Sequence, residues 1–432
     1  MPNFDNKEVT MSYSEKMLDQ LDRGQLADAK KSFAWALRKD DDETLFNLAE
    51  ELYGLGFLNQ AQRVYLKLLE KYPDEDVLRT ALAEIAIDND HNDEALTYLN
   101  QITEDSDAYV PALLVAADLY QTEEQFEVTE SKLLEAYQLA PDEPAVLFAL
   151  GEFYNLIGKP EQAIRYYFAL IQAGYLEFAK VDIAGRLGTA YAQSGHFDQA
   201  LGYLEQVDPQ YQSSDIRFQT GFTQLQLGKL NAAEQSLQAL IDDDSQYASA
   251  YPALATVYEQ ENDYQQALKT VQEGLSVDQY NENLYAQAAD YASHLGDDQL
   301  MDQYLQRAHE IDPDNLTITI QYSNFLLSQQ RDQDNLNLLA SVEDDEVVDP
   351  QVEWNRAQSY WRLEQFDQAG QAFSAALPAF EDNPDFLYQL IDYYQAVGER
   401  DLMFDQLQRY VELVPTDTEM AERLAEFEDQ MY

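Results

Sequence analysis

The chain has 432 residues, of which 81 are acidic and 26 basic, so its formal net charge is −55. Hydrophobic residues make up 45% of it, and 30 Tyr with 19 Phe are too many aromatic residues for a disordered acidic chain. With 16 Gly and 13 Pro, it has little material for long loops or turn-rich β architectures, so helices joined by short turns are favoured.

Composition also excludes several classes of function. The absence of cysteine removes disulfides, thiolate metal sites and cysteine nucleophiles. Residues 1–10 lack a signal-peptide pattern and no run of about 18 apolar residues occurs, so we expect a cytoplasmic protein that does not span a membrane. The negative charge repels phosphate backbones and anionic lipids, so neither nucleic acid nor a membrane surface is an expected partner.

Small residues recur with a fixed period along almost the whole chain. A mainly alanine column, from Ala29 to Met403, has successive spacings of 32, 34, 34, 34, 37, 33, 34, 34, 34, 34 and 34 residues. Twelve residues before it runs another column, from Met17 to Ile391, in which ten of twelve residues are Ala, Gly or Ser. Because two small columns let the arms of a hairpin approach closely, the sequence predicts twelve helical hairpins. We name these the second-helix column and the first-helix column.

Turn and stop signals keep the same frame. Five residues before the second-helix column, seven of twelve residues are Gly, which suits a helix end that enters left-handed backbone space. This turn column runs from Gly24 to Gly398. Four prolines lie twelve residues after the second-helix column, where the second helix must stop: Pro73, Pro141, Pro313 and Pro415.

Period, small columns, turn glycines and prolines together resemble the tetratricopeptide repeat (TPR) family. The resemblance covers residues 10–417 and implies an all-α fold, a right-handed α-solenoid of about twelve hairpins. Three repeats depart from the pattern at Asp90, at Gln330 with Asn335, and at Glu364, so we expect looser packing there.

The same frame gives the predicted organisation of the chain. An N-terminal tail (1–9) precedes repeats 1–5 (10–174) and repeats 6–12 (175–417), and a capping helix (418–432) follows. The division lies at the 37-residue spacing, where three extra residues around 172–177 are expected to lengthen one turn. The capping helix is predicted from apolar residues at helical spacing: Met420, Leu424, Phe427 and Met431.

No cofactor, metal or catalytic site is predicted. Gly54-Leu55-Gly56 lacks the third glycine of a phosphate-binding loop. The segment that starts at Asp88 has Asp93 and Leu99 where a calcium loop has glycine and glutamate. The four histidines fall in different repeats and show no helical pairing.

The resemblance implies that first helices line a concave groove, and that the residue after the first-helix column points into it. Four consecutive repeats carry acids there: Glu50, Glu84, Asp118 and Glu152. With Phe46, Tyr53 and Phe148 nearby, they predict a docking track for a basic or basic-aromatic protein segment, as opposed to an ordinary solvated face.

A second candidate surface lies in the eleventh repeat. Trp361 and Arg362 follow Trp354 on one predicted helix, and tryptophan with arginine is typical of binding hot spots. Packing against the neighbouring hairpin is the alternative for Trp361, and the favoured one for Trp354.

We therefore predict a cytoplasmic scaffold or adaptor that binds proteins or peptides. A weaker resemblance, to acidic all-repeat cytoplasmic TPR proteins of Gram-positive bacteria, implies an alternative role in regulated proteolysis or cell-envelope control. An enzyme with an unrecognised site is a third, less favoured alternative, and homo-oligomerisation through a terminal repeat stays open.

Overall fold

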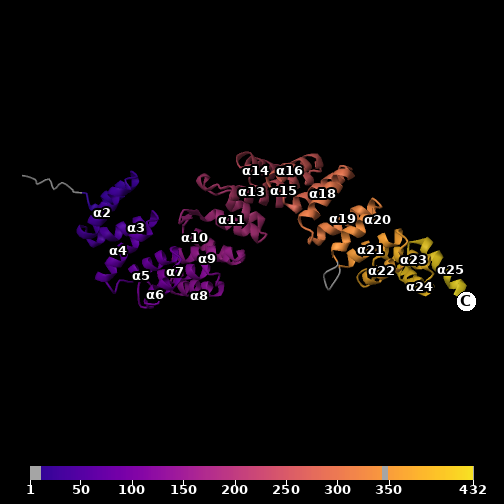
Figure 1. Ribbon diagram of the computed structural model, residues 1–432, viewed down its shortest axis with the longest axis horizontal. Coiled ribbons are helices and arrows are strands. Elements are labelled where there is room, and N and C mark those ends of the chain that lie inside the picture. The colour runs from indigo at the N-terminus through magenta and orange to yellow at the C-terminus, as the bar shows by residue number, and fades with distance from the viewer. Residues whose placement is uncertain (1–10, 343–348, 432) are drawn as a thin grey trace, which may run out of the picture. The chain divides into compact units, whose positions relative to one another are not determined.

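The computed structural model describes residues 11–342 and 349–431, which form twelve helical hairpins and one further helix (Figure 1). The predicted all-α, TPR-type solenoid of hairpins is confirmed. The predicted N-terminal tail, residues 1–9, lies outside the described residues. Contacts divide the chain into two units, residues 1–212 and 213–432. The division that the sequence predicts after residue 174 is based on the spacing of the repeats, and it stays a prediction.

The first unit holds six hairpins. Its first helices are α1 (Tyr13–Asp22), α3 (Asp42–Gly54), α5 (Asp76–Asp88), α7 (Tyr109–Thr122), α9 (Pro144–Leu156) and α11 (Ile183–Gln193). Their partners are α2 (Leu26–Lys39), α4 (Leu58–Lys71), α6 (Asn92–Leu99), α8 (Phe126–Leu139), α10 (Pro160–Gln172) and α12 (Phe197–Leu204). Strands β1 (Glu177–Phe178) and β2 (Val181–Asp182) and the 3₁₀ turn η1 (Pro209–Tyr211) complete this unit.

The second unit holds the other six hairpins. Its first helices are α13 (Ser214–Gln226), α15 (Ala250–Gln260), α17 (Glu282–His294), α19 (Leu316–Ser328), α21 (Pro350–Arg362) and α23 (Pro384–Val397). Their partners are α14 (Leu230–Asp243), α16 (Tyr264–Val277), α18 (Asp298–Ile311), α20 (Asp332–Leu339), α22 (Phe366–Phe380) and α24 (Arg400–Leu413). The 3₁₀ turn η2 (Ala340–Val342) follows α20, and α25 (Thr418–Met431) follows the last hairpin.

All twelve turn-column residues have a left-handed backbone, with φ between 54° and 81°. In each hairpin the next residue donates its N–H to a carbonyl five positions back, as Phe57 does to Leu52 at 2.8 Å, which closes the helix end. The turn is the same where glycine is missing: Gln365 donates to Tyr360 at 2.8 Å after Glu364. The expected departures in sequence therefore do not change this turn.

Small residues bring the two helices of each hairpin together. Every first-helix-column residue is buried. At Gly151 an added Cβ would lie 2.5 Å from the ring of Tyr167, and at Gly188 it would lie 2.8 Å from Leu204. These positions require glycine because the partner helix occupies the space that a side chain needs.

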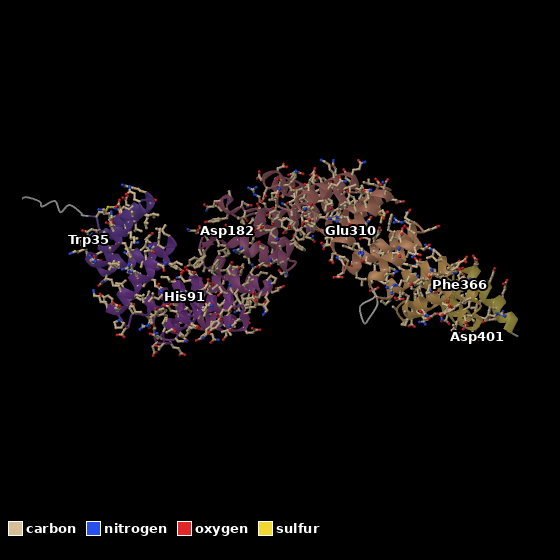
Figure 2. All side chains as sticks on the ribbon, in the orientation of Figure 1. Trp35, His91, Asp182, Glu310, Phe366 and Asp401 are labelled. Atoms are coloured by element: carbon tan, nitrogen blue, oxygen red, sulfur yellow. The ribbon has the colours of Figure 1, made fainter. Side chains whose placement is uncertain are left out.

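The long connection between α10 and α11 contains a β-hairpin, which the sequence analysis did not predict. Strands β1 and β2 pair antiparallel around Ala179 and Lys180, both of which have positive φ. Such two-residue turns usually contain Asn-Gly or a similar pair, so Ala-Lys gave no signal. The hairpin leads directly into α11, whose N-terminus is capped by Asp182 (labelled in Figure 2) through a 2.8 Å bond from the Gly185 N–H.

Helix α25 covers the end of the last hairpin. Met420 is buried, and Leu424 and Phe427 pack into the same apolar cluster as Met403 and Leu407. The side chain of Met431 lies outside the described part of the chain.

We predict that Glu364→Gly stabilises the protein. Glu364 holds a left-handed conformation (φ 59°) that an L side chain disfavours, so glycine should raise the free energy of unfolding by about 0.5–1 kcal/mol. Chemical denaturation checks the change. Gly56→Ala, at φ 77° with no other atom near the new Cβ, should lower stability by a similar amount. A loss of stability in both variants would contradict this account of the turn.

Candidate functional site

The four predicted acids occupy equivalent places on neighbouring first helices of the first unit. Glu50 lies on α3, Glu84 on α5, Asp118 on α7 and Glu152 on α9, each directly after a buried first-helix-column residue. None of the four is fully buried. We call these four residues the acidic track.

The middle of the acidic track carries concentrated negative charge. Burial, together with the carboxylates of Asp88 and Asp118, raises the pKa of Glu84 to about 7. Burial and Asp88 also raise the pKa of Asp118. Both shifts mean that the charged forms of these groups lack compensation, and a cation placed here would lower both pKa values.

Asp88 belongs to this cluster, although the sequence analysis considered it only as the start of a segment that does not match a calcium loop. It lies one helical turn after Glu84, so both carboxylates share a face of α5. That spacing was the available signal. We call Glu84, Asp88 and Asp118 the acidic cluster.

Tyr53, predicted as a site residue, lies against the acidic cluster. Burial, a hydrogen bond to Asp88 and the charges of Glu84, Asp88 and Asp118 all raise the pKa of its phenol. Its hydroxyl is therefore a neutral donor at the edge of the cluster and leaves the negative charge in place.

Glu152 differs from the other members of the acidic track because it already has partners. Its Oε1 accepts a hydrogen bond from the Tyr167 hydroxyl at 2.6 Å and lies 2.9 Å from Nε of Arg186. The negative charge of Glu152 is thus largely compensated by side chains of the same protein.

Phe46 lines a pocket of about 410 Å³ formed by α3, α4 and α5. Leu68, Tyr72, Val77 and Leu78 supply most of its apolar wall. The acids Asp42, Glu43 and Glu75 also line this pocket. Phe46 is one helical turn before Glu50, so the pocket and the acidic track share a face of α3. We call it the Phe46 pocket.

Phe148 is engaged by the unpredicted β-hairpin. Its ring centroid lies 5.1 Å from that of Phe178 in β1. The two rings therefore pack together far along the chain from the Phe46 pocket.

Trp354 and Trp361 both pack their rings in the second unit. Trp361 makes edge contacts with Phe373 and Tyr393, and Trp354 contacts Phe380 and Phe386. Packing explains the bulk of both side chains, although neither is fully buried.

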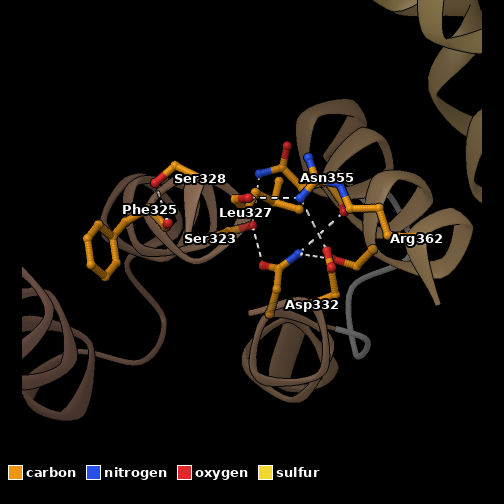
Figure 3. A network of polar contacts seen from close by, with 9 residues as sticks. Ser323, Phe325, Leu327, Ser328, Asp332, Asn355 and Arg362 are labelled. Carbon is orange, nitrogen blue, oxygen red and sulfur yellow. Dashed lines mark hydrogen bonds and ion pairs between the residues drawn. The ribbon is translucent and has the colours of Figure 1, made fainter. Parts of the chain in front are cut away.

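Arg362 belongs to a network of polar contacts between α19, α20 and α21 (Figure 3). It donates to the Leu327 carbonyl at 2.8 Å and lies 3.4 Å from Asp332. The Arg362 side chain is 41% exposed, so it is anchored by these contacts and still reaches solvent.

Asn335 is the centre of this network, and its packing is not loose, contrary to the expectation at this position. It is fully buried, and its amide contacts Ser323 at 2.6 Å and Ser359 at 2.9 Å. Asn355 continues the network with a 2.8 Å bond to Ser323. In this hairpin, hydrogen bonds between polar side chains thus replace the contact that a small apolar residue of the second-helix column makes in most other hairpins.

The remaining motifs show no assembled site in the described residues. His91, labelled in Figure 2, is 63% exposed and lies 3.8 Å from Glu94. No cluster of three His, Asp or Glu side chains suited to a metal ion occurs within 11–342 and 349–431. None of the described helices combines the length and apolar character needed to cross a membrane.

Comparison with known proteins places this architecture in a family. Models of YpiA-like tetratricopeptide repeats match residues 121–175, models of YpiA-like C-terminal tetratricopeptide repeats match 350–417, and a general tetratricopeptide repeat model matches 46–111. The TPR repeat-containing protein YpiA of Bacillus subtilis (strain 168) is 31% identical over 392 residues, covering 90% of this chain and 92% of that protein. Protein CTR9 homolog of Arabidopsis thaliana is 25% identical over 252 residues, covering 55% of this chain and 23% of that protein.

Solved structures give weaker likenesses. The chain is similar to the APC/C hetero-tetramer Cut9–Hcn1, at 13% identity and a TM-score of 0.38, covering 97% of this chain and 96% of that one. It is also similar to pilF of Pseudomonas aeruginosa, at 19% identity and a TM-score of 0.41, covering 49% and 97%. Likenesses at this level say nothing about function.

We predict that Asn335→Ala destabilises the second unit although alanine fits the second-helix column. It removes the acceptor of the buried Ser323 hydroxyl and the donor to Ser359 and the Asn355 carbonyl, which should lower the free energy of unfolding by about 1–3 kcal/mol in chemical denaturation. Asn337→Ala, exposed on the same helix, should change it by less than about 0.5 kcal/mol. Equal stability of Asn335→Ala and wild type would disprove a stabilising role of the network.

We predict that Glu84→Gln stabilises the protein in a pH-dependent way. The folded pKa of Glu84, about 7, exceeds its usual value of 4.5, so the stability contributed by protonated Glu84 is present below pH 4.5 and is lost as pH rises through 7. Above pH 7 the variant should be more stable than wild type by roughly 1–3 kcal/mol, and this difference in stability should disappear toward pH 4.5. Denaturation across this pH range checks the slope. A stability difference that does not change with pH would show that Glu84 is not the titrating group. The control is Glu127→Gln, at an exposed position of α8.

Proposed function

The chain belongs to the YpiA-like family of tetratricopeptide repeat proteins, and we propose that it is a cytoplasmic adaptor that binds a basic or basic-aromatic segment of a partner protein. The segment lies against the first helices of residues 1–212. TPR proteins generally mediate protein–protein interaction and are typically non-catalytic, and we propose no reaction for this chain.

The acidic cluster is the observation that carries this proposal. Burial, together with repulsion from the carboxylates of Asp88 and Asp118, raises the pKa of Glu84, and no basic side chain of the described residues is among the groups that act on it. A lysine or arginine of a partner would relieve this repulsion and be held by charge-assisted bonds. The net charge of −55 would also attract such a partner at long range and low salt.

The Phe46 pocket supports an aromatic or large aliphatic residue within the same segment. Its wall is mainly apolar. Asp42 is paired with Lys71, and the other two acids, Glu43 and Glu75, favour a neighbouring basic residue. Because Phe46 and Glu50 share a face of α3, one extended segment can reach both.

The narrower alternative is an adaptor in bacterial regulated proteolysis or cell-envelope control. The similarity to a Bacillus subtilis protein over 90% of the chain is the observation that keeps it in view. Co-purification with a protease subunit and a protein that it degrades would support it, and a partner from an unrelated process would exclude it.

The test of the main proposal uses a short labelled peptide that alternates Lys and Phe. We expect it to bind the full chain with an affinity that falls as salt rises, because exposed charges are screened. The triple variant Glu84→Gln, Asp88→Asn, Asp118→Asn should weaken binding by about tenfold or more, which corresponds to roughly 1.4 kcal/mol. Fluorescence anisotropy measures both effects.

The matched control removes the same charge from second helices. Glu70, Asp93 and Glu127 are exposed on α4, α6 and α8. Their Gln, Asn and Gln variants should bind the peptide almost as wild type does. Equal losses in the two triple variants would show that only net charge matters, and the proposed site would be wrong.

A further inference from the structure

A second pocket, of about 520 Å³, lies on the first helices α19, α21 and α23 of residues 213–432. Its walls differ from those of the first unit because they consist largely of amides. Five amide side chains line it: Asn324, Gln351, Asn355, Gln358 and Gln389. A smaller pocket of about 300 Å³ shares Gln358, Arg362 and Gln389 with it and adds Trp361. We call the two pockets together the amide groove.

The amide groove is close to neutral although the chain as a whole is strongly acidic. Arg362 and Asp385 are the charged residues that line the larger pocket. With one residue of each sign among its eleven lining residues, this pocket has no cluster of like charges that would select a basic segment. Its ligand must be recognised by hydrogen bonding and apolar contact.

Several amide groups of the groove have hydrogen-bonding capacity left over. Asn324 accepts at 2.8 Å from Asn355, and its own N–H groups donate to no other described residue. Gln389 accepts at 3.0 Å from Nε1 of Trp354, and its N–H groups likewise donate to nothing in the part of the chain that the structure describes. Within the described residues Gln358 makes no side-chain hydrogen bond. The groove thus offers donors and an acceptor, the combination that pairs with a peptide main chain.

The amides are held in place from behind. Asn355 is 1% exposed; besides its bond to Asn324 it accepts from Gln351 at 2.9 Å and donates to Ser323. The Trp354 ring, packed against Phe380 and Phe386, fixes the direction of its bond to Gln389. Side chains that are already ordered lose little entropy when a ligand binds.

The geometry points to the amide groove as a binding site for the main chain of an extended, largely uncharged peptide segment, separate from the basic segment proposed for residues 1–212. The unused amides of Asn324, Gln358 and Gln389 bind peptide N–H and C=O groups, and the exposed faces of Trp354, Trp361 and Tyr388 contact the intervening side chains. The inference rests on the proposed adaptor function but not on the acidic track. It gives one chain two docking surfaces of different chemistry.

The test uses random peptides displayed on phage and selected on the full chain, followed by synthesis of the enriched sequences. We expect a class of peptides without enrichment of Lys or Arg. Its binding should fall by about tenfold in the variant Asn324→Ala, Gln358→Ala, Gln389→Ala, since two or more hydrogen bonds are lost. N-methylation of single main-chain amides should weaken binding, because main-chain N–H groups are recognised.

Two further variants separate binding from folding. Gln358→Ala alone breaks no hydrogen bond among the described residues, so a loss of binding in this variant cannot come from damage to the polar network. Gln303, Gln371 and Gln408 are exposed on the second helices α18, α22 and α24, and their joint change to Ala should leave binding unchanged.

The outcomes distinguish this inference from the proposed function. Uncharged peptides that keep binding to the acidic-cluster variant but not to the amide variant would support the amide groove. Failure to select any such peptide, insensitivity to N-methylation, or selection only of acidic peptides that depend on Arg362 would overturn it. Selection only of basic peptides lost in the acidic-cluster variant would overturn it while leaving the proposed function intact.

Discussion

The close approach of two helices at small residues is the contact on which the rest of this protein depends. Each hairpin brings a buried first-helix-column residue against its second helix, and the left-handed turn residue between them sets the return of the chain. At Gly151 the partner ring of Tyr167 leaves no room for even a methyl group. Because the same contact is repeated twelve times, residues at equivalent positions of neighbouring first helices fall in line, and surface chemistry can extend over several repeats.

The two units use this arrangement differently. In residues 1–212 the lined-up positions gather carboxylates, and the cost is visible in the raised pKa values of Glu84 and Asp118. In residues 213–432 amides line the equivalent helices, and a buried network around Asn335 and Asn355 holds them. Buried polar groups are tolerated only when they are hydrogen-bonded, so a network of this kind both stabilises a hairpin and orients the groups that it exposes.

The sequence was sufficient for the fold because the information is periodic. Small columns, turn residues and the prolines at helix ends each predicted the same boundaries, as at Pro73 after α4 and Pro313 after α18. It was insufficient at the β-hairpin, because Ala179 and Lys180 are not residues that normally mark a left-handed turn. The sequence was also misleading at Asn335. A polar residue in a column of small residues suggested looser packing, whereas its hydrogen-bond partners on α19 and α21 hold it in place.

The candidate site was only partly predictable for a related reason. Register alone placed Glu50, Glu84 and Asp118 on one face, and the spacing of Glu84 and Asp88 on α5 was a signal that the sequence analysis did not use. Register could not reveal that Arg186 pairs with Glu152, because that contact depends on side-chain approach between helices. Packing was the favoured expectation for Trp354, whose ring contacts Phe386. Binding and packing were both open for Trp361, and its ring contacts Tyr393.

The proton balance of peptide binding tests the central claim most directly. Glu84, with a pKa of about 7, is partly protonated near that pH, and a bound lysine would lower this pKa and expel the proton. Titration calorimetry of the Lys/Phe peptide near that pH, in buffers of different ionisation enthalpy, should therefore report proton release in wild type and none in Glu84→Gln. Binding without proton release in wild type would contradict the account, because the peptide would then be docking away from the acidic cluster.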